Sequence, residues 1–276
     1  MESKLNIIYE NDDYLVVEKE AGITVNNAET TGNEKTLQDL IDESGKIKKD
    51  GGGSDFNKRS GIVHRLDKET SGVIVIAKNP DSFIHLQNQF KERRVGKSYL
   101  ALVHGSMFPS SGEISAPVGR LPWNRKRFGV IAGGREAVTR YKVLSVFGSR
   151  LSDHSESVVG TPVRANRQLA NQNRKTDNRK PITEYYSLVR LHPKTGRTHQ
   201  IRVHLKYINH SIFSDPLYGG RKTSREDRKL LPRFFLHAEK ISFFDPKTEK
   251  KVSYESDLPH ELKALLEKLK LKKDNS

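Results

Sequence analysis

The segment from residue 61 to residue 79 constrains the fold most strongly, because its two halves have opposite character. Residues 73–77 form an unbroken apolar run rich in β-branched side chains, which is too short for a helix and predicts a strand buried on both faces. The preceding half carries His64, Arg65, Asp67, Lys68 and Glu69. A carboxylate among basic residues, on a loop anchored by a rigid strand, suits a site that needs an ionised acid in a fixed place. The spacing alone fits a surface turn with salt bridges equally well.

Other short apolar segments predict more strands than helices. Residues 5–9 and 14–17 flank a polar stretch with Asn11 and Asp12, which indicates a hairpin. Further strands are predicted at residues 97–103, 137–147, 184–191, 234–236 and 240–244. Because the strands do not alternate regularly with helices, the pattern favours an α+β fold over a doubly wound sheet.

Helical signals begin at four places, at residues 36, 80, 198 and 258. Asn79 can cap the second of these helices, with Pro80 in its first turn. The last helix shows leucines at helical spacing, which predicts packing against the rest of the chain. Residues 46–60 include three consecutive glycines and show no periodicity, so they predict a flexible loop.

The charge of the chain points to a polyanionic partner. It carries 49 lysines and arginines against 34 acidic residues, a formal net charge of +15 at pH 7. Nucleic acid is the first class of partner that this predicts, and an anionic membrane surface is the second. No apolar run approaches the roughly 20 residues that span a bilayer, and the N-terminus lacks the basic and apolar regions of a signal peptide. With no cysteine there is neither a disulfide nor a thiolate nucleophile. We therefore expect a soluble, cytoplasmic protein that does not contact a membrane.

Residues 119–135 combine positive charge with aromatic side chains and contain no acidic residue. Trp123 and Phe128 lie among Arg120, Arg125, Lys126, Arg127 and Arg135. This combination suits an RNA backbone with exposed bases that can stack. We therefore predict a basic loop that binds RNA through Arg120, Arg125, Lys126 and Arg127. The alternative is a solvated hairpin tip whose aromatic rings pack on the core.

Residues 148–183 interrupt the strand pattern. Six lysines and arginines lie between residues 161 and 180, with many asparagines and glutamines and few apolar residues. This composition predicts a polar, basic insertion that is a loop or disordered. Such an insertion is either an added RNA-binding arm or a solvated excursion.

The order of the motifs resembles that of the RluA-type pseudouridine synthases, which convert uridine to pseudouridine inside RNA. The string His64-Arg65-Leu66-Asp67, followed by Thr70-Ser71-Gly72, is similar to the catalytic motif of that family. The resemblance extends to the N-terminal strands and to residues 97–103, 135–137 and 196–205. It covers most of the chain apart from residues 148–183 and the last residues.

The resemblance implies a mixed, largely antiparallel sheet flanked by helices, with an RNA-binding cleft across one face. We expect one catalytic domain over residues 1–276. Some relatives carry an S4-like RNA-binding domain before it, and none is expected here because the catalytic pattern begins near residue 5. Exchanging a C1′–N1 bond for a C1′–C5 bond neither oxidises nor hydrolyses anything, so no cofactor or metal is expected. No His, Asp or Glu cluster shows metal-ligand spacing. Nothing demands a protein partner or more than a monomer.

By resemblance, Asp67 is the essential aspartate of the family. It would act at the sugar as a nucleophile or stabiliser, as carboxylates do in glycoside hydrolysis. Attack on C1′, attack on uracil C6 and a route through a glycal all need this carboxylate ionised. A carboxylate that stays ionised beside an enclosed base needs a cationic partner. The family's third motif makes Arg202 that candidate, with Arg197 as a weaker one.

Two further positions match the family's base pocket. In the family, the tyrosine that corresponds to Tyr99 lies against the target uracil. Its ring would hold the base by stacking, and its hydroxyl would accept or relay a proton in the last step. Leu236 matches an apolar position that lines the same pocket. Taken alone, either side chain fits an ordinary core position equally well.

A uridine in folded RNA must leave its stack to reach such a pocket. The resemblance implies that Arg65 fills the vacated space, because a guanidinium is planar, can stack and pairs with phosphate. Arg197, at the start of a predicted helix, suits a phosphate. His64 is expected to hydrogen-bond within the loop and to belong to the RNA-binding residues, and it is not assigned as a general base.

Two other functions remain open. A non-catalytic RNA-binding or chaperone module would keep the fold and bind RNA in a salt-sensitive manner without modifying it. The joint presence of Asp67, Tyr99 and Arg202 argues against this alternative, because binding alone needs no such set. A glycosidase that releases uracil would need a second carboxylate to activate water, and the sequence shows no obvious candidate.

Overall fold

The computed structural model describes residues 5–28, 31–32, 34–49, 51–148 and 185–274. Its strands are β1 (Asn6–Glu10), β2 (Tyr14–Lys19), β3 (Ser71–Ala77), β4 (Gly96–His104), β5 (Ser111–Ser115), β6 (Val118–Leu121), β7 (Asn124–Val130), β8 (Val138–Phe147), β9 (Tyr186–Pro193), β10 (Leu236–Phe244) and β11 (Lys251–Glu255). Its helices are α1 (Leu37–Glu43), α2 (Asp55–Lys58), α3 (Pro80–Lys91), α4 (Gln200–Tyr207), α5 (Arg221–Asp227) and α6 (His260–Asp274).

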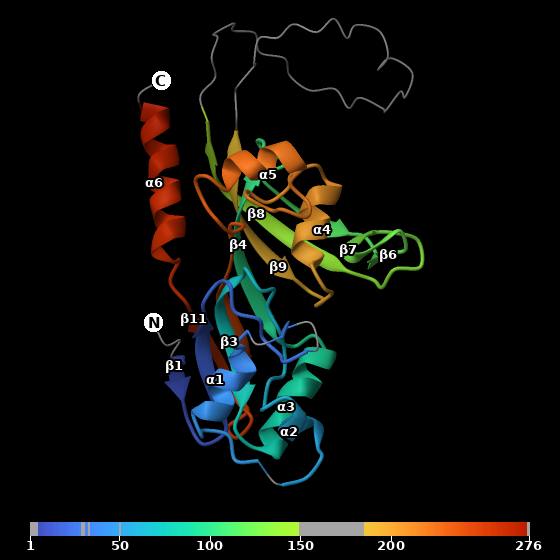
Figure 1. The fold of residues 1–276 in the computed structure, drawn as a ribbon, viewed down its shortest axis with the longest axis vertical. Helices are drawn as coiled ribbons and strands as arrows, with labels where there is room; N and C mark the ends of the chain where they lie inside the picture. The colour runs from blue at the N-terminus through green and yellow to red at the C-terminus, as the bar shows by residue number, and fades with distance from the viewer. Residues whose placement is uncertain (1–4, 29–30, 33, 50, 149–184, 275–276) are drawn as a thin grey trace, which may run out of the picture.

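One long sheet organises the described part of the chain. Its strand order is β1-β2-β3-β10-β4-β9-β8-β5, and β11 pairs with β10 outside this path. The pairs are antiparallel except for β3 with β10, which run parallel. Helices α1, α2 and α3 lie at the end of the sheet that holds β1, β2 and β3, whereas α4 and α5 lie at the other end (Figure 1). This confirms the predicted α+β fold with a largely antiparallel sheet.

Strand β3 is buried at every position, as its apolar run predicts. It pairs along its length with β2, and with β10 only at Ser71 and Gly72. Gly72 has a φ of +120°, and a Cβ placed there would lie 2.2 Å from the carbonyl oxygen of Ala238. Only glycine fits this approach, because any side chain would push the two strands apart. Gly72 therefore fixes where the loop before β3 meets β10.

The predicted helices at residues 36–43 and after Asn79 are present as α1 and α3. The side-chain oxygen of Asn79 accepts a hydrogen bond from the backbone N–H of Ser82 at 2.9 Å, so it caps α3 as predicted. The prediction of a flexible loop over residues 46–60 is wrong in part, because α2 lies inside it. This short helix buries Phe56 against the ring of Phe83 on α3. A single buried ring gives no periodicity that a sequence pattern could reveal.

Residues 119–135 form a hairpin, which corrects the predicted basic loop. Strands β6 and β7 pair antiparallel as a separate two-stranded sheet. Trp123, in the turn, has 78% of its surface exposed, whereas Phe128 packs against a small cluster around Val118 and Tyr218. Arg120, Arg125, Lys126 and Arg127 therefore lie on a paired β-ribbon whose base packs against this cluster.

The C-terminal third differs from prediction in its element boundaries. The two closing strands predicted at residues 234–236 and 240–244 are one strand, β10. Helix α4 begins at Gln200, two residues after the predicted start. Helix α5 and strand β11 were not predicted. Helix α5 lacks an apolar periodicity, and the alternation of Val252 and Tyr254 with polar residues in β11 extends over only five residues. The last helix is present as α6, with Leu262 and Leu265 buried.

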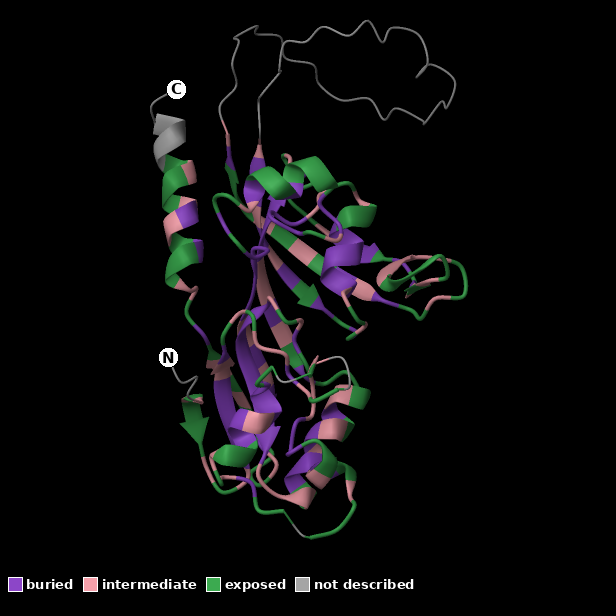
Figure 2. Cartoon of the chain, viewed as in Figure 1, coloured by how far each residue is buried: buried purple, intermediate pink, exposed green. Residues whose placement is uncertain are grey.

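Two apolar clusters fill the sheet's two ends, and Tyr99 packs against both. The buried segments in Figure 2 continue from β2 and β3 through β10 and β4. None of the described helices is long and apolar enough to cross a bilayer. The insertion predicted at residues 148–183 lies, apart from Gly148, outside the described residues.

Candidate active site

A cleft of about 510 Å³ lies at the middle of the sheet, between the half that holds β1, β2 and β3 and the half that holds β9, β8 and β5. Its walls come from the loop before β3, the connection from α3 into β4, and the turn from β9 into α4. Leu236, at the start of β10, also lines it. The cleft brings together seven residues predicted from the sequence: His64, Arg65, Asp67, Tyr99, Arg197, Arg202 and Leu236.

His64 supports the loop that carries Asp67. Its Nε2 accepts a hydrogen bond from the backbone N–H of Val75 at 3.0 Å, and its ring stacks on Phe90 with centroids 4.7 Å apart. Burial, with a smaller effect from Lys97, lowers the pKa of His64 to about 3, so the ring is neutral and Nε2 is free to accept. The loop is thereby attached to β3. The predicted RNA contact of His64 stays a prediction.

Lys19 holds the other side of the same loop. Its buried amine donates to the carbonyl oxygens of Glu20 and Ile23, each at 2.8 Å, and of Lys68 at 3.0 Å. Burial lowers the pKa of Lys19 to about 7, although the charge of Asp67 acts in the opposite direction. The residue directly after Asp67 is therefore fixed through its backbone.

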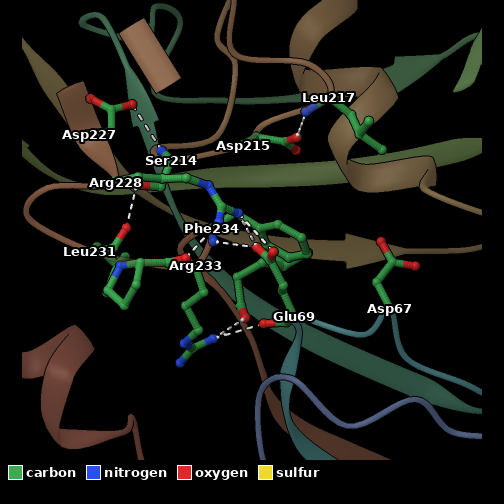
Figure 3. Close-up of polar contacts among 12 residues, drawn as sticks. Asp67, Glu69, Ser214, Asp215, Leu217, Asp227, Arg228, Leu231, Arg233 and Phe234 are labelled. Atoms are coloured by element: carbon green, nitrogen blue, oxygen red, sulfur yellow. Dashed lines mark hydrogen bonds and ion pairs between the residues drawn. The ribbon is translucent and has the colours of Figure 1, made fainter. Parts of the chain in front are cut away.

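Arg202 lies beside Asp67, as the third motif implies. Its Nη1 donates to Oδ2 of Asp67 at 3.0 Å, while its Nε and Nη2 donate to the two oxygens of Asp215 at 2.7 and 3.0 Å. Asp215 is fully buried and also accepts from the backbone N–H of Tyr218 and from that of Leu217, the latter shown in Figure 3. The buried carboxylate orients the guanidinium, and the guanidinium holds the carboxylate that faces the cleft.

Two aromatic rings enclose the guanidinium of Arg202. Its Cζ lies 4.4 Å from the ring centroid of Phe234 and 5.0 Å from that of Tyr218. Burial lowers the pKa of Arg202, but hydrogen bonds and charges from Asp215 and Asp67 outweigh this effect and raise the pKa overall. The guanidinium therefore stays charged in an apolar surrounding.

Glu69 attaches the end of the motif loop to the segment before β10. Its two oxygens accept from Nη2 of Arg228 at 2.8 and 2.7 Å, and Oε2 also accepts from the backbone N–H of Phe234 at 3.1 Å (Figure 3). Its carbonyl oxygen accepts from Nη1 of Arg233 at 3.1 Å. The loop that carries Asp67 and the ring that covers Arg202 are thus linked.

Tyr99 and Leu236 form the apolar side of the cleft. Tyr99 lies on β4 and is partly exposed, whereas Leu236 has 3% of its surface exposed. Burial and the nearby charge of Asp67 raise the pKa of the Tyr99 hydroxyl. The phenol is therefore protonated at neutral pH, which leaves it able to donate a hydrogen bond.

His199 lies next to Asp67 in a left-handed backbone conformation, with φ 56° and ψ 17°. Its Nε2 is 4.0 Å from Oδ2 of Asp67, and its Nδ1 is 2.9 Å from the hydroxyl of Tyr218. That hydroxyl accepts from the backbone N–H of Phe128 on β7 at 3.1 Å, so it can donate its own proton to Nδ1. This assignment puts the imidazole proton on Nε2, toward Asp67. Burial lowers the pKa of His199, and the charge of Asp67 opposes that effect.

The predicted RNA-binding residues lie in two places. Arg65 and Arg197 line the cleft, and Nε of Arg197 donates to the carbonyl oxygen of Glu136 at 3.1 Å. The other four, Arg120, Arg125, Lys126 and Arg127, lie on β6 and β7, outside the cleft lining. Arg127 extends over the ring of Tyr218, with Cζ 5.5 Å from its centroid. The hairpin is therefore joined to the cleft through Tyr218.

Sequence reasoning missed the residues that orient Arg202 and His199, namely Asp215, Tyr218 and Phe234. Residues 215–220 contain an aspartate, a proline and two glycines, which mark a turn. Nothing in that pattern shows that its carboxylate faces residue 202. Within the described ranges, no group of three or more His, Asp or Glu side chains is arranged to hold a metal ion.

Comparisons with known proteins identify the family of the chain. The family model described as RNA pseudouridylate synthase matches residues 13–207. An uncharacterized RNA pseudouridine synthase of Bacillus subtilis, YlyB, is 33% identical over 266 residues, which cover 96% of this chain and 73% of that protein. Ribosomal large subunit pseudouridine synthase D of Neisseria meningitidis serogroup B is 34% identical over 274 residues, and that of Nitrosomonas europaea is 31% identical over 269 residues. The match covers 97% and 96% of this chain, but 62% and 65% of those two synthases.

Solved structures with the same fold include two human domains. Human RNA Pseudouridylate Synthase Domain Containing 1 matches with a TM-score of 0.62 and 24% identity, over 97% of this chain and 95% of that one. Human RNA Pseudouridylate Synthase Domain Containing 4 matches with a TM-score of 0.62 and 21% identity, over 96% of this chain and 93% of that one. At these identities the likeness establishes the fold alone.

Proposed function

The chain belongs to the RNA pseudouridylate synthase family, and from this premise we propose that it isomerises uridine to pseudouridine in structured RNA, with Asp67 as the essential carboxylate. The proposal takes residues 1–276 as one catalytic domain that acts as a monomer. The observation that supports it most is the hydrogen bond of 3.0 Å from Arg202 to Asp67 at the wall of a cleft. A binding module needs no carboxylate held in this way by a buried guanidinium.

The reaction exchanges one bond of the nucleotide for another. The C1′–N1 bond breaks, the uracil turns, and a C1′–C5 bond forms, while the hydrogen on C5 leaves as a proton and N1 gains one. Asp67 serves either as the nucleophile, at C1′ or at uracil C6, or as the carboxylate that supports a glycal route. The hydrogen bond from Arg202 holds in place the carboxylate that all three routes require.

Tyr99 would hold the uracil by stacking from the apolar side of the cleft. Because burial and Asp67 raise its pKa, the hydroxyl keeps its proton at neutral pH and does not act as a phenolate base. It can still pass a proton along a hydrogen bond when the C5 proton leaves. Leu236 would pack against the same base.

The RNA would reach Asp67 across a positively charged surface. Arg65, beside Asp67 in the motif loop, would take the place of the everted base, and Arg197 would contact a phosphate. The β6–β7 hairpin would bind a neighbouring part of the RNA, with Trp123 exposed for stacking. Two relatives are named as large ribosomal subunit synthases, so the large-subunit ribosomal RNA is the first candidate substrate, with transfer RNA as the second. We place the protein in the cytoplasm, where both RNAs are found.

Tritium release tests this function. The purified protein is incubated with unmodified ribosomal and transfer RNA labelled with tritium at uracil C5. The proposal predicts release into water and the appearance of pseudouridine, without free uracil. Binding without release would favour the non-catalytic module, and free uracil would favour a glycosidase. Pseudouridine mapping in a deletion strain and its parent would then identify the RNA and the position.

A further inference from the structure

Lys97 is a cation on the wall of the cleft that has no carboxylate partner among the residues that the structure describes. It lies on β4 two residues before Tyr99, so both side chains point to the same face of the strand. Its side chain is partly buried and lines the cleft together with Tyr99 and the turn at residues 193–202. In the described part of the chain it makes no ion pair, and its one hydrogen bond, to the carbonyl oxygen of Thr195, is long at 3.5 Å.

Keeping the amine of Lys97 charged at this site costs free energy when no anion is bound. Burial alone lowers the pKa of Lys97 to about 8, so the amine is mostly charged at neutral pH although nothing balances it. Partly buried ammonium groups are normally paired. By contrast, the more exposed Lys240 on the adjacent strand β10 pairs with Glu255 at 2.7 Å.

The surroundings of Lys97 are also cationic. Lys91 and Arg93, at the end of α3, line the same wall, and Arg65 and Arg197 line the cleft from the other two segments. None of these four makes an ion pair with a carboxylate among the described residues. Five unpaired cations around one cleft attract an anion with several acceptor oxygens.

The position of Lys97 separates it from the reacting sugar. Its Nζ reaches the carbonyl oxygen of Thr195 in the turn from β9 into α4, whereas Asp67 lies on the loop before β3 and accepts from Arg202. From a different wall of the cleft, the amine is placed to serve a part of the RNA beyond the nucleotide that reacts. In an RNA strand the anionic groups next to that nucleotide are its phosphodiesters.

We propose that the Lys97 amine binds a non-bridging oxygen of a phosphodiester adjacent to the target nucleotide, with Lys91 and Arg93 adding charge at the rim. The proposal rests on the proposed function, because it takes the cleft as the place where RNA binds. Lys97 thereby fixes the strand while Asp67 faces the sugar. Phosphate contacts of this kind set the register of a bound strand without reading its sequence.

Salt dependence of RNA binding tests the proposal. Affinity is measured with an unmodified large-subunit ribosomal RNA transcript, in the Asp67→Asn background so that no reaction occurs. Lys97→Met removes the charge and keeps the stem, and Lys97→Arg keeps the charge. Lys240→Met is the matched control, because it removes one lysine charge from the adjacent strand outside the cleft.

Loss of one phosphate contact reduces the slope of log affinity against log salt by about 0.7 to 0.9. Over a fourfold rise in salt, the parent should therefore lose about threefold more affinity than Lys97→Met. Lys97→Arg and Lys240→Met should keep the parental slope. A parental slope in Lys97→Met would overturn the proposal and make Lys97 a structural lysine.

The pH dependence gives a second readout. The parent should bind RNA less tightly as pH rises through about 8, because the free amine loses its charge there. Around Lys97, His64 is neutral over this range and Arg65, Arg93 and Arg197 stay charged, while Lys91 is exposed. Lys97→Met and Lys97→Arg should both lack this step, and a step that persists in both would contradict the assignment. Failure of the function itself shows separately, as wild-type protein that releases no tritium.

Discussion

The guanidinium of Arg202 donates to Asp67 at 3.0 Å with one nitrogen, while its other two nitrogens bind the fully buried Asp215. Arg202 comes from α4 and Asp67 from the loop before β3, so this contact joins two walls of the cleft that come from different halves of the sheet. The carboxylate at the cleft is therefore held by a group that is itself fixed from behind.

Removing Arg202 should cost stability as well as activity. Arg202→Met leaves Asp215 buried without its cation, and breaking such a pair costs about 3–5 kcal/mol in free energy of unfolding. Arg190→Met is the control, because Arg190 pairs with Glu239 on the same sheet but has 41% of its side chain exposed. That change should cost about 1 kcal/mol or less. Urea unfolding measures the free energy of unfolding of both variants. Equal losses would show that the buried pair stabilises the protein no more than the exposed pair does.

Tyr218→Phe should lower kcat and leave KM for RNA nearly unchanged. The change keeps the ring against Arg202 but removes the hydroxyl that joins Phe128 N–H to His199 Nδ1. One hydrogen bond of this kind is worth roughly a tenfold effect at most. Tyr207→Phe, on the exposed face of α4, is the control.

The same variant should change the pH profile. Burial lowers the pKa of His199, and a hydroxyl that donates to Nδ1 favours the same neutral ring. Its loss should therefore let the pKa rise toward the usual value. The acid limb of kcat should therefore move to higher pH. An unchanged acid limb would mean that Tyr218 supports the fold without orienting His199.

Stability should fall as pH drops below about 6.5. Burial lowers the pKa of His64 to about 3, so between these values the unfolded chain binds a proton that the folded chain does not. One such group contributes about 1.4 kcal/mol per pH unit, and this stability is present above the unfolded pKa. His64→Gln retains an acceptor for Val75 N–H and should reduce the slope by one proton. His260→Gln, at an exposed position on α6, should keep it. Equal slopes in all three proteins would contradict the burial of a neutral His64.

Local patterns predicted the parts of the fold that local physics decides. The apolar run at residues 73–77 identified β3, because a strand buried on both faces needs no partner information. Asn79 and Pro80 identified the start of α3 for the same reason. By contrast, α2, α5 and β11 are short, and their placement depends on contacts with distant segments, such as Phe56 on Phe83. Periodicity in the sequence gives no information about contacts between distant segments.

The site divides in the same way. The order of the motifs predicted Asp67, Tyr99 and Arg202 as site residues, because the family that the sequence resembles places them together. The supporting residues could not be predicted. Phe234 binds Glu69 from a distant part of the chain, and no local pattern shows that the carboxylate of Asp215, in the segment after α4, faces Arg202. Lys97 was not singled out because the sequence pattern of a lysine on a strand fits a solvated side chain. Only the structure shows that no acidic residue in its described part pairs with Lys97.

Tyr99 variants separate stacking from proton transfer. Tyr99→Phe keeps the ring and should bind RNA as tightly as the parent. Tyr99→Ala should weaken binding by about 1–3 kcal/mol, the value of stacking one base on an aromatic ring. Because the hydroxyl keeps its proton at neutral pH, Tyr99→Phe should slow only the steps that use it as a donor or relay. Equal affinity of both variants, measured in the Asp67→Asn background, would place the uracil away from Tyr99.

Tritium release by Asp67→Asn compared with wild type tests most directly whether the reaction depends on the carboxylate of Asp67. Asparagine keeps an oxygen that can accept from Nη1 of Arg202, so the variant should fold and bind RNA. It lacks the charge that every route to pseudouridine requires, and its release should equal that of the sample without enzyme. Release at the wild-type rate would contradict the proposal that Asp67 is the essential carboxylate of the reaction.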